Sequence, residues 1–214
     1  MSYWEHERPV HRTRAISTAN LAAATAKLLD FGGTGAVTVR AVARELGVAP
    51  ASLYSRITAA DDLFDIALDA TLGEDMNIRL AERGVTLEEL MIAYYRHLVQ
   101  HPWASRVIAM RAPRGPNYLA LSERMVVLLE QGGHADPLTA AYALSNFVTG
   151  SASTTPMAGS ERVAAVPAEL APRYAALHAT QHLDPERIFL TGLRALLVTS
   201  SDTGGASLDR AQRA

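Results

Sequence analysis

Residues 38–57 read TVRAVARELGVAPASLYSRI, and this stretch decides how the rest of the sequence is interpreted. Thr38 is a favoured helix N-cap type, and the apolar side chains after it recur at helical spacing until Gly47 ends the helix. Pro50 is preorganised for the first turn of a second helix, which ends near Ile57. Two short helices joined by a tight turn predict a helix-turn-helix, although an ordinary helical hairpin has the same pattern.

The sequence on either side of this stretch is also helical in pattern. Ser17 is an N-cap candidate for a preceding helix, and Thr58 with Asp61 forms a start like a capping box for a following one. Thr86 and Glu89 form a further capping box. Four prolines stand where helices are expected to begin: Pro102, Pro116, Pro137 and Pro185. No stretch has the alternation of a strand, so we predict an all-α fold with a three-helix helix-turn-helix domain and a larger helical bundle.

Composition excludes several classes of protein. The 214 residues include no cysteine, which excludes disulfides, thiolate metal sites and cysteine nucleophiles and fits a reducing cytoplasm. The first residues are acidic and polar, unlike a signal peptide, and the apolar runs are far shorter than a membrane span. We therefore expect a cytoplasmic protein that makes no contact with a membrane.

Charge is unevenly distributed along the chain. Residues 1–60 contain seven basic and four acidic side chains, whereas residues 61–214 contain thirteen basic and eighteen acidic ones. A mildly basic N-terminal segment suits contact with a polyanion. An imbalance of this size also arises by chance, so charge alone leaves both interpretations open.

The order of residues in 38–57 closely resembles the DNA-binding motif of the tetracycline-repressor (TetR) family, which has a Thr-led helix, a Leu-Gly-Val turn and a helix with Leu-Tyr. The helix that follows Ser17 and the segment DDLF at 61–64 extend this resemblance over about residues 16–72. The pieces HPW at 101–103, RGPN at 114–117 and FVTG at 147–150 are similar to the C-terminal domain of the tetracycline-repressor type. The resemblance implies a transcriptional repressor that binds a palindromic operator in double-stranded DNA as a homodimer and is released by a small hydrophobic effector.

The resemblance also implies roles for residues of the motif. It places the hydroxyl and amide of Thr38 near a phosphate and the phenol of Tyr54 on another, and such contacts position the domain while base contacts specify sequence. The expected DNA-binding residues are Thr38, Arg40, Arg44, Ala49, Ala51, Ser52, Tyr54, Ser55 and Arg56. The family usually has Lys or Arg where this chain has Ala60, so one phosphate contact is missing or comes from Arg12 and Arg14.

The C-terminal part is expected to hold an apolar effector pocket and a dimer interface. For each pocket candidate, an ordinary core residue is the favoured alternative. The candidates are Phe64, Leu68, Met91, Tyr94, Tyr95, Val107, Met110, Tyr118, Leu121, Asn146, Phe147 and Thr149. The helices from Pro137 and Pro185 resemble the pair that forms the family's dimeric four-helix interface. Interface candidates are Ala140, Ala143, Leu144, Leu190, Leu193, Arg194 and Leu197.

We expect no cofactor, metal or catalytic residue. Tetracycline-binding members hold Mg²⁺ partly through histidine, and the corresponding positions here are Met76 and Ile108, so a different effector is expected. The pairs His97/His101 and His178/His182 have a metal-ligand spacing, but surface histidines are the favoured interpretation. No phosphate-binding Gly-rich loop, Gly-x-Ser-x-Gly elbow or His-Glu-x-x-His motif is present, which leaves an enzyme or a helical adaptor as weaker alternatives.

The sequence divides into four expected parts. Residues 1–15 are a flexible arm, and residues 16–59 are the helix-turn-helix domain. Residues 60–200 are the helical domain for ligand binding and dimerisation, and residues 201–214 are a disordered tail.

Overall fold

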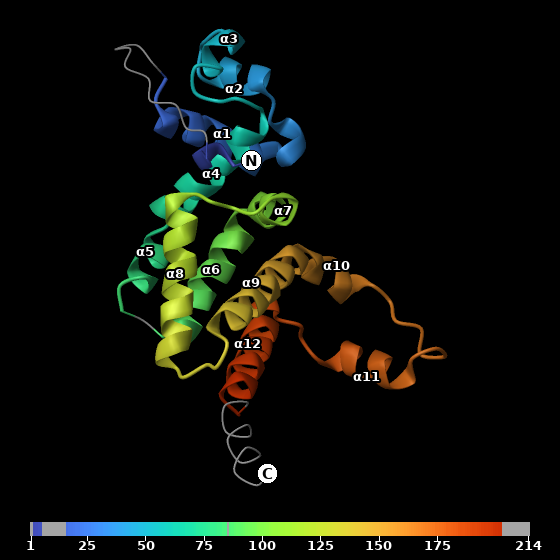
Figure 1. The fold of residues 1–214 in the computed structure, drawn as a ribbon. Helices are drawn as coiled ribbons and strands as arrows, with labels where there is room; N and C mark the ends of the chain where they lie inside the picture. Colours follow the sequence, from blue (N-terminus) through green and yellow to red (C-terminus); the bar gives the residue numbers. More distant parts are fainter. Residues whose placement is uncertain (1, 6–15, 85, 203–214) are drawn as a thin grey trace, which may run out of the picture. The chain divides into compact units, whose positions relative to one another are not determined.

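The computed structural model describes residues 2–5, 16–84 and 86–202 (Figure 1). All regular structure in this part of the chain is helical, which confirms the predicted all-α class. The chain forms two compact units, one up to Leu128 and one from Leu129 onward. Within the described residues, no helix is both long and apolar enough to cross a membrane.

The N-terminal helices of the first unit form a small head. Ser17 caps the first helix, because its side chain accepts a hydrogen bond from the amide of Asn20. Leu21, Val42 and Leu53 come from three different helices and are fully buried, so the three helices share one core. The elements are α1 (Thr18–Gly32), the 3₁₀ turn η2 (Thr34–Ala36), α2 (Val39–Glu45) and α3 (Pro50–Leu53).

The rest of the first unit is a bundle that packs against the head mainly through its first helix. Its elements are α4 (Asp61–Glu74), α5 (Met76–Ala81), α6 (Leu87–Gln100), α7 (Pro102–Met110) and α8 (Pro116–Gln131). Helix α4 follows the helix-turn-helix and packs extensively against α1. Its side chains are buried almost continuously from Asp62 to Asp69, so α4 is surrounded by other elements. The boundary predicted at 59/60 therefore lies inside one compact unit.

The second unit contains α9 (Pro137–Thr154), the 3₁₀ turn η3 (Thr155–Met157), α10 (Ala158–Val163), α11 (Pro172–Thr180) and α12 (Pro185–Asp202). Helices α9 and α12 pack together, with the rings of Phe147 and Phe189 stacked at a centroid distance of 5.7 Å. Gly192 permits this approach, because a Cβ atom there would overlap the ring of Phe147. All four prolines predicted to begin helices do so.

One expectation needs correction, and two expected segments lie mostly outside the described residues. Tyr3–Glu5 is a 3₁₀ turn, η1, with Tyr3 buried against α4. The rest of the expected arm, including Arg12 and Arg14, lies outside the described residues. The expected capping box of Thr58 and Asp61 does not form at the N-terminus of α4, where Ala60 is the N-cap; instead the Asp62 carboxylate accepts from the amides of Thr58 and Ala59 in the preceding turn. Helix α12 extends to Asp202, and the rest of the expected tail, residues 203–214, lies outside the described residues.

Candidate nucleic-acid interface

The helix-turn-helix is built around two caps and one glycine. The Thr38 hydroxyl accepts a hydrogen bond from the Ala41 amide at 3.0 Å and so caps the N-terminus of α2. Thr38 itself is exposed to solvent. Gly47 has a φ of +67°, a left-handed conformation that glycine adopts without steric cost. Pro50 then begins α3. Local sequence therefore fixes the start of α2, the turn and the start of α3.

The helix α3 ends at Leu53, earlier than the predicted end near Ile57, and residues 54–56 continue as a turn. Together α3 and this turn present one face to the core and another to solvent. Leu53 and Ile57 are buried, as predicted. Tyr54 is 55% exposed, and the surrounding side chains are small. The exposed residues predicted to face base edges are Ala49, Ala51, Ser52 and Ser55. A protruding helix with short side chains can approach the floor of a DNA groove closely.

The three arginines of the predicted interface differ in their surroundings. Arg40 and Arg44 are exposed on α2. Arg56 is half-buried, and its Nε donates to the carbonyl oxygen of Ile16 at 2.8 Å. That bond ties the end of the helix-turn-helix to the start of α1, a positioning role that the sequence did not indicate. Ala60 stands exposed just before α4, with no side chain able to bind phosphate.

The predicted pocket residues fall in both units. Seven of those in the first unit are buried: Phe64, Leu68, Met91, Tyr94, Tyr95, Val107 and Leu121. Tyr118 is half-buried, whereas Met110 is 58% exposed at the end of α7. In the second unit, Phe147 and Thr149 are half-buried and Asn146 is exposed. The exposed positions of Met110 and Asn146 are less suited to an enclosed pocket within one chain.

The predicted dimer residues lie on α9 and α12 with differing exposure. Leu144 and Leu193 are buried within this chain, so they have little surface left for a partner. Ala143 and Arg194 are exposed, and Ala140, Leu190 and Leu197 are half-buried. Three large apolar side chains that were not predicted as interface residues are more exposed than the predicted leucines on the same helices: Leu138, Tyr142 and Ile188.

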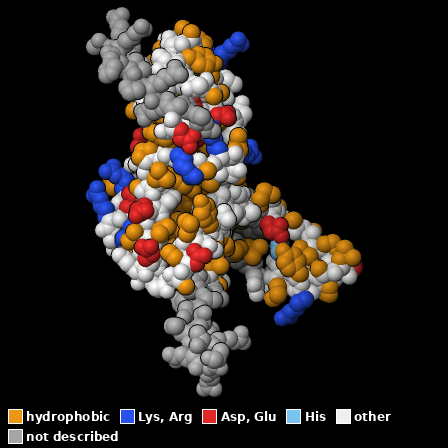
Figure 2. All heavy atoms as spheres, viewed as in Figure 1, with side chains coloured by type: hydrophobic (Ala, Val, Ile, Leu, Met, Phe, Trp, Pro, Cys, Tyr) orange, Lys and Arg blue, Asp and Glu red, His pale blue; other side chains and the backbone are white. Residues whose placement is uncertain are grey.

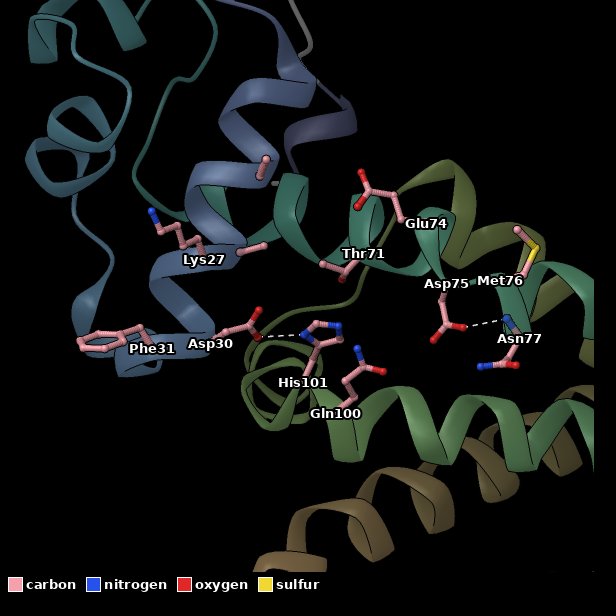
Figure 3. A pocket seen from close by; sticks show the side chains of 12 residues that line it. Lys27, Asp30, Phe31, Thr71, Glu74, Asp75, Met76, Asn77, Gln100 and His101 are labelled. Carbon is pink, nitrogen blue, oxygen red and sulfur yellow. Dashed lines mark hydrogen bonds and ion pairs between the residues drawn. The ribbon is translucent and has the colours of Figure 1, made fainter.

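A surface cavity of about 880 Å³ lies in the first unit between α1, the α4–α5 corner and the end of α6 (Figure 3). None of its residues was predicted as a ligand contact. Asp30 accepts from the indole Nε1 of Trp103 at 2.6 Å and lies 2.8 Å from Nδ1 of His101, which ties α1 to the corner between α6 and α7. Phe31 is 94% exposed at the cavity rim.

The histidines differ from the surface pairs that were expected. His97 is buried, its Nδ1 lies 3.0 Å from Asp75 Oδ2, and its ring lies 5.0 Å from that of His101. Burial lowers the pKa of His97, while the hydrogen bond with Asp75 acts in the opposite direction. Among the described residues, no three His, Asp or Glu side chains form a group able to hold a metal ion.

Three buried carboxylates on α4 are the main site feature that the sequence did not reveal. Asp62 accepts from the amides of Thr58 and Ala59 in the turn before the helix. Asp65 accepts from the Tyr3 amide at 2.8 Å and lies 3.2 Å from Nε of Arg111. Asp69 accepts from the amides of Asn117 and Tyr118 at 2.9 and 3.0 Å. Their spacing of three and four residues places them on adjacent turns, but acidic residues at such spacing are usually read as solvated.

Comparisons with known proteins agree with this arrangement. Residues 21–65 match the family described as bacterial regulatory proteins, tetR family, and residues 85–198 match the tetracyclin repressor-like C-terminal domain. The first match covers the helix-turn-helix, and the second covers most of the remaining chain. This is a family of regulators and not of enzymes.

Two curated relatives are regulators from actinomycetes. An HTH-type transcriptional regulator of Saccharopolyspora erythraea is 36% identical over 158 residues, which are 70% of this chain and 66% of the relative. The HTH-type transcriptional repressor DrrR1 of Streptomyces coeruleorubidus is 31% identical over 140 residues, 60% of this chain and 50% of the relative. The matched residues thus span between half and two thirds of these relatives.

A solved structure shows the same fold with a bound small molecule. ActR of Streptomyces coelicolor in complex with actinorhodin is 26% identical, with a TM-score of 0.68 over 87% of this chain and 99% of ActR. Together with the two family matches, this similarity spans both units. The chain belongs to the tetracycline-repressor (TetR) family of bacterial regulatory proteins.

Proposed function

We propose that the protein is a transcriptional repressor that binds a palindromic operator as a homodimer and releases it when a small hydrophobic effector binds. The observation that carries the proposal is the exposed surface of α3 and the turn after it, which presents small side chains and the phenol of Tyr54. The preceding helix, α2, is capped by Thr38. Thr38 offers a helix N-terminus to a phosphate, and Arg40 and Arg44 offer exposed positive charge. Ser52 and its small neighbours supply the contacts to base edges.

Two arguments support dimerisation: a palindromic operator needs two heads, and the second unit exposes apolar side chains. Two heads about 34–36 Å apart read the two halves of a palindrome on one face of the duplex. Helices α9 and α12 expose large apolar side chains, among them Tyr142 at 62%. Exposed apolar surface of this kind favours association with a second copy. Replacing Tyr142 with Glu should shift the protein from dimer to monomer in light scattering, whereas Tyr174→Glu on α11 serves as the control.

The effector is proposed from the interior of the first unit and from the ligands of a relative. Met91, Tyr94 and Tyr95 are buried on α6 and offer adaptable apolar surface with two phenols. ActR, which shares the fold, binds actinorhodin. A medium-sized aromatic molecule suits these side chains, and it would act by preferring the conformation that does not bind DNA.

The test is binding of the purified full chain to labelled duplexes from the region upstream of its own coding sequence, measured by fluorescence anisotropy. We expect one duplex to bind at least about 1,000-fold more tightly than a scrambled duplex of equal length. Tyr54→Phe should weaken binding to all duplexes to a similar degree, because a phosphate contact carries no sequence information. Ser52→Ala should instead change the order of preference among base-substituted duplexes.

The control variant is Tyr174→Phe, which makes the same chemical change on α11 of the second unit and should leave binding unchanged. Equal affinity for the upstream and scrambled duplexes would contradict the proposal. A uniform loss from both Tyr54→Phe and Ser52→Ala would contradict the assignment of the faces of α3.

A further inference from the structure

The surface cavity between α1, the α4–α5 corner and the end of α6 contains none of the predicted DNA-binding or effector-binding residues (Figure 3). Its volume of about 880 Å³ is within the range of small-molecule pockets, about 300–1,000 Å³. Twelve residues line it, whereas a stable protein–protein interface uses about 20–30 residues on each side. The size of the cavity therefore suits a small molecule better than a protein.

The side chains around the cavity are mainly acidic. Asp30 comes from α1, and Glu74 and Asp75 come from the α4–α5 corner (Figure 3). Lys27 is the only Lys or Arg side chain among the lining residues, and its Nζ pairs with Glu45, which does not line the cavity. The negative charge of the cavity is therefore only partly balanced within the chain, and it favours a cationic ligand.

Two of the three carboxylates have oxygens available to a ligand. Asp30 is 43% exposed and forms its contacts with Trp103 Nε1 and His101 Nδ1 through one oxygen, Oδ1, so Oδ2 is left for another donor. Glu74 is exposed and forms no hydrogen bond or ion pair with the part of the chain that the structure describes. Asp75, by contrast, uses both oxygens for bonds within the chain, so it contributes charge alone.

An exposed aromatic ring lies at the rim of the same cavity. Phe31 follows Asp30 at the end of α1 and is 94% exposed, the highest value of any large hydrophobic side chain that the structure describes. Single exposed hydrophobic side chains are common on protein surfaces, but this one stands next to a carboxylate with an available oxygen. The face of an aromatic ring attracts cations. The rim thus combines the two kinds of group that bind an organic cation.

We propose that this cavity binds a small organic cation, a protonated or quaternary amine, with Asp30 and Glu74 as its anionic contacts and Phe31 as its aromatic contact. The apolar part of the ligand lies against the small side chains of Ala23 and Ala26 on α1. A metal ion is a poorer fit, because the described residues include no group of three His, Asp or Glu side chains able to hold one. The proposed site depends neither on DNA binding nor on the proposed effector region.

Titration of the full ¹⁵N-labelled chain, followed by NMR at low salt and pH 7, tests the site. The probe is N,N-dimethylbenzylamine, which is protonated at this pH, and N,N-dimethylbenzamide is a neutral compound of similar shape. We expect the cation to shift the amide signals of residues 23–31, 71–77 and 100–101 saturably, with a Kd of about 1 mM. The neutral amide should bind at least about tenfold more weakly, because the carboxylates attract only the charged probe. Added salt should weaken binding of the cation.

Two variants assign the contacts. Phe31→Leu keeps an apolar side chain but removes the ring face, so we expect the Kd for the cation to rise about threefold. Glu74→Gln removes one charge with little change of shape and should raise the Kd by a similar factor of about three. Both residues are exposed, so neither change should disturb folding. The matched controls are Tyr174→Leu on α11 and Glu130→Gln on α8, which alter an exposed aromatic and an exposed acidic side chain and should leave the Kd unchanged.

Each possible failure has a distinct reading. Absence of saturable shifts at residues 23–31 and 71–77 would overturn the site. Shifts centred on Met91, Tyr94 and Tyr95 instead would place the probe in the proposed effector region, which would also overturn the site. Equal affinity for the cation and the neutral amide would overturn the class of ligand. Unchanged affinity in both Phe31→Leu and Glu74→Gln, or equal losses in the controls, would overturn the assigned contacts. Because no DNA is present, none of these results bears on the proposed repressor function.

Discussion

The exposed face of α3 and the buried face of α4 lie close in the sequence but are built in opposite ways. On α3 and the turn after it, the exposed side chains other than Tyr54 are short; Ser55, for example, donates through its hydroxyl to the nearby carbonyl oxygen of Ser52. On α4 each buried carboxylate binds a different element of the first unit. The difference indicates that α3 can change its DNA preference by single substitutions at little structural cost, whereas substitutions on α4 alter the fold.

The largest expected effect is at Asp65. Asp65→Ala removes the buried carboxylate that accepts from the Tyr3 amide and pairs with the Arg111 guanidinium, so we expect the free energy of unfolding to fall by about 3 kcal/mol. Urea denaturation measures this change. The control is Asp61→Ala on the same helix, where the carboxylate is exposed and should contribute less than about 0.5 kcal/mol. Equal losses from both variants would remove the contrast between buried and exposed sites.

The next effect concerns close packing between α4 and the start of α8, where Gly115 lies against Asp69. Gly115→Ala places a methyl group against the Asp69 side chain, so we expect a loss of about 2 kcal/mol from overpacking. Gly35→Ala is the matched control, because a Cβ atom there meets no neighbouring atom and the backbone is not in a left-handed conformation. A neutral result for Gly115→Ala in the same denaturation assay would mean that α8 moves away from α4 at low cost.

A smaller effect should appear as a dependence of stability on pH. Folding lowers the pKa of His97 below its ordinary value of 6.5, so around that pH the unfolded chain binds more protons than the folded chain. Stability should therefore decrease as the pH falls from 7 through 6.5 toward the folded pKa. His97→Gln should reduce this decrease in thermal melts at pH 7 and pH 5.5, whereas His182→Gln at an exposed position should retain it. Identical pH profiles for wild type and His97→Gln would contradict this account.

The smallest effect on stability is expected at the DNA-reading face. Ser52→Ala, which should change sequence preference, should alter the free energy of unfolding by less than about 0.5 kcal/mol because Ser52 is exposed. Urea denaturation of Ser52→Ala and Asp65→Ala compares the loss in the free energy of unfolding at an exposed residue of α3 with the loss at a buried residue of α4. A loss above 1 kcal/mol would show that α3 is structurally constrained as well.

Local signals allowed much of the fold to be predicted. The caps at Ser17, Thr38 and Thr86 and the helix-starting prolines depend on neighbouring residues only, and the structure confirms them. Features that depend on distant residues were not predicted. Asp65 and Asp69 are ordinary acidic residues in the sequence, and only the approach of Tyr3, Arg111 and Asn117 makes them buried acceptors. His97 was interpreted as exposed for the same reason.

The central claim is that the face built by α2 and α3 binds operator DNA as a dimer, and the salt dependence of binding tests it most directly. The logarithm of the association constant should fall linearly with the logarithm of salt concentration. Arg40→Ala should make that slope shallower by about 1.8, which corresponds to one phosphate contact in each of two heads, whereas Arg173→Ala on α11 should not change it. An unchanged slope in Arg40→Ala, or an equal change in Arg173→Ala, would contradict the claim.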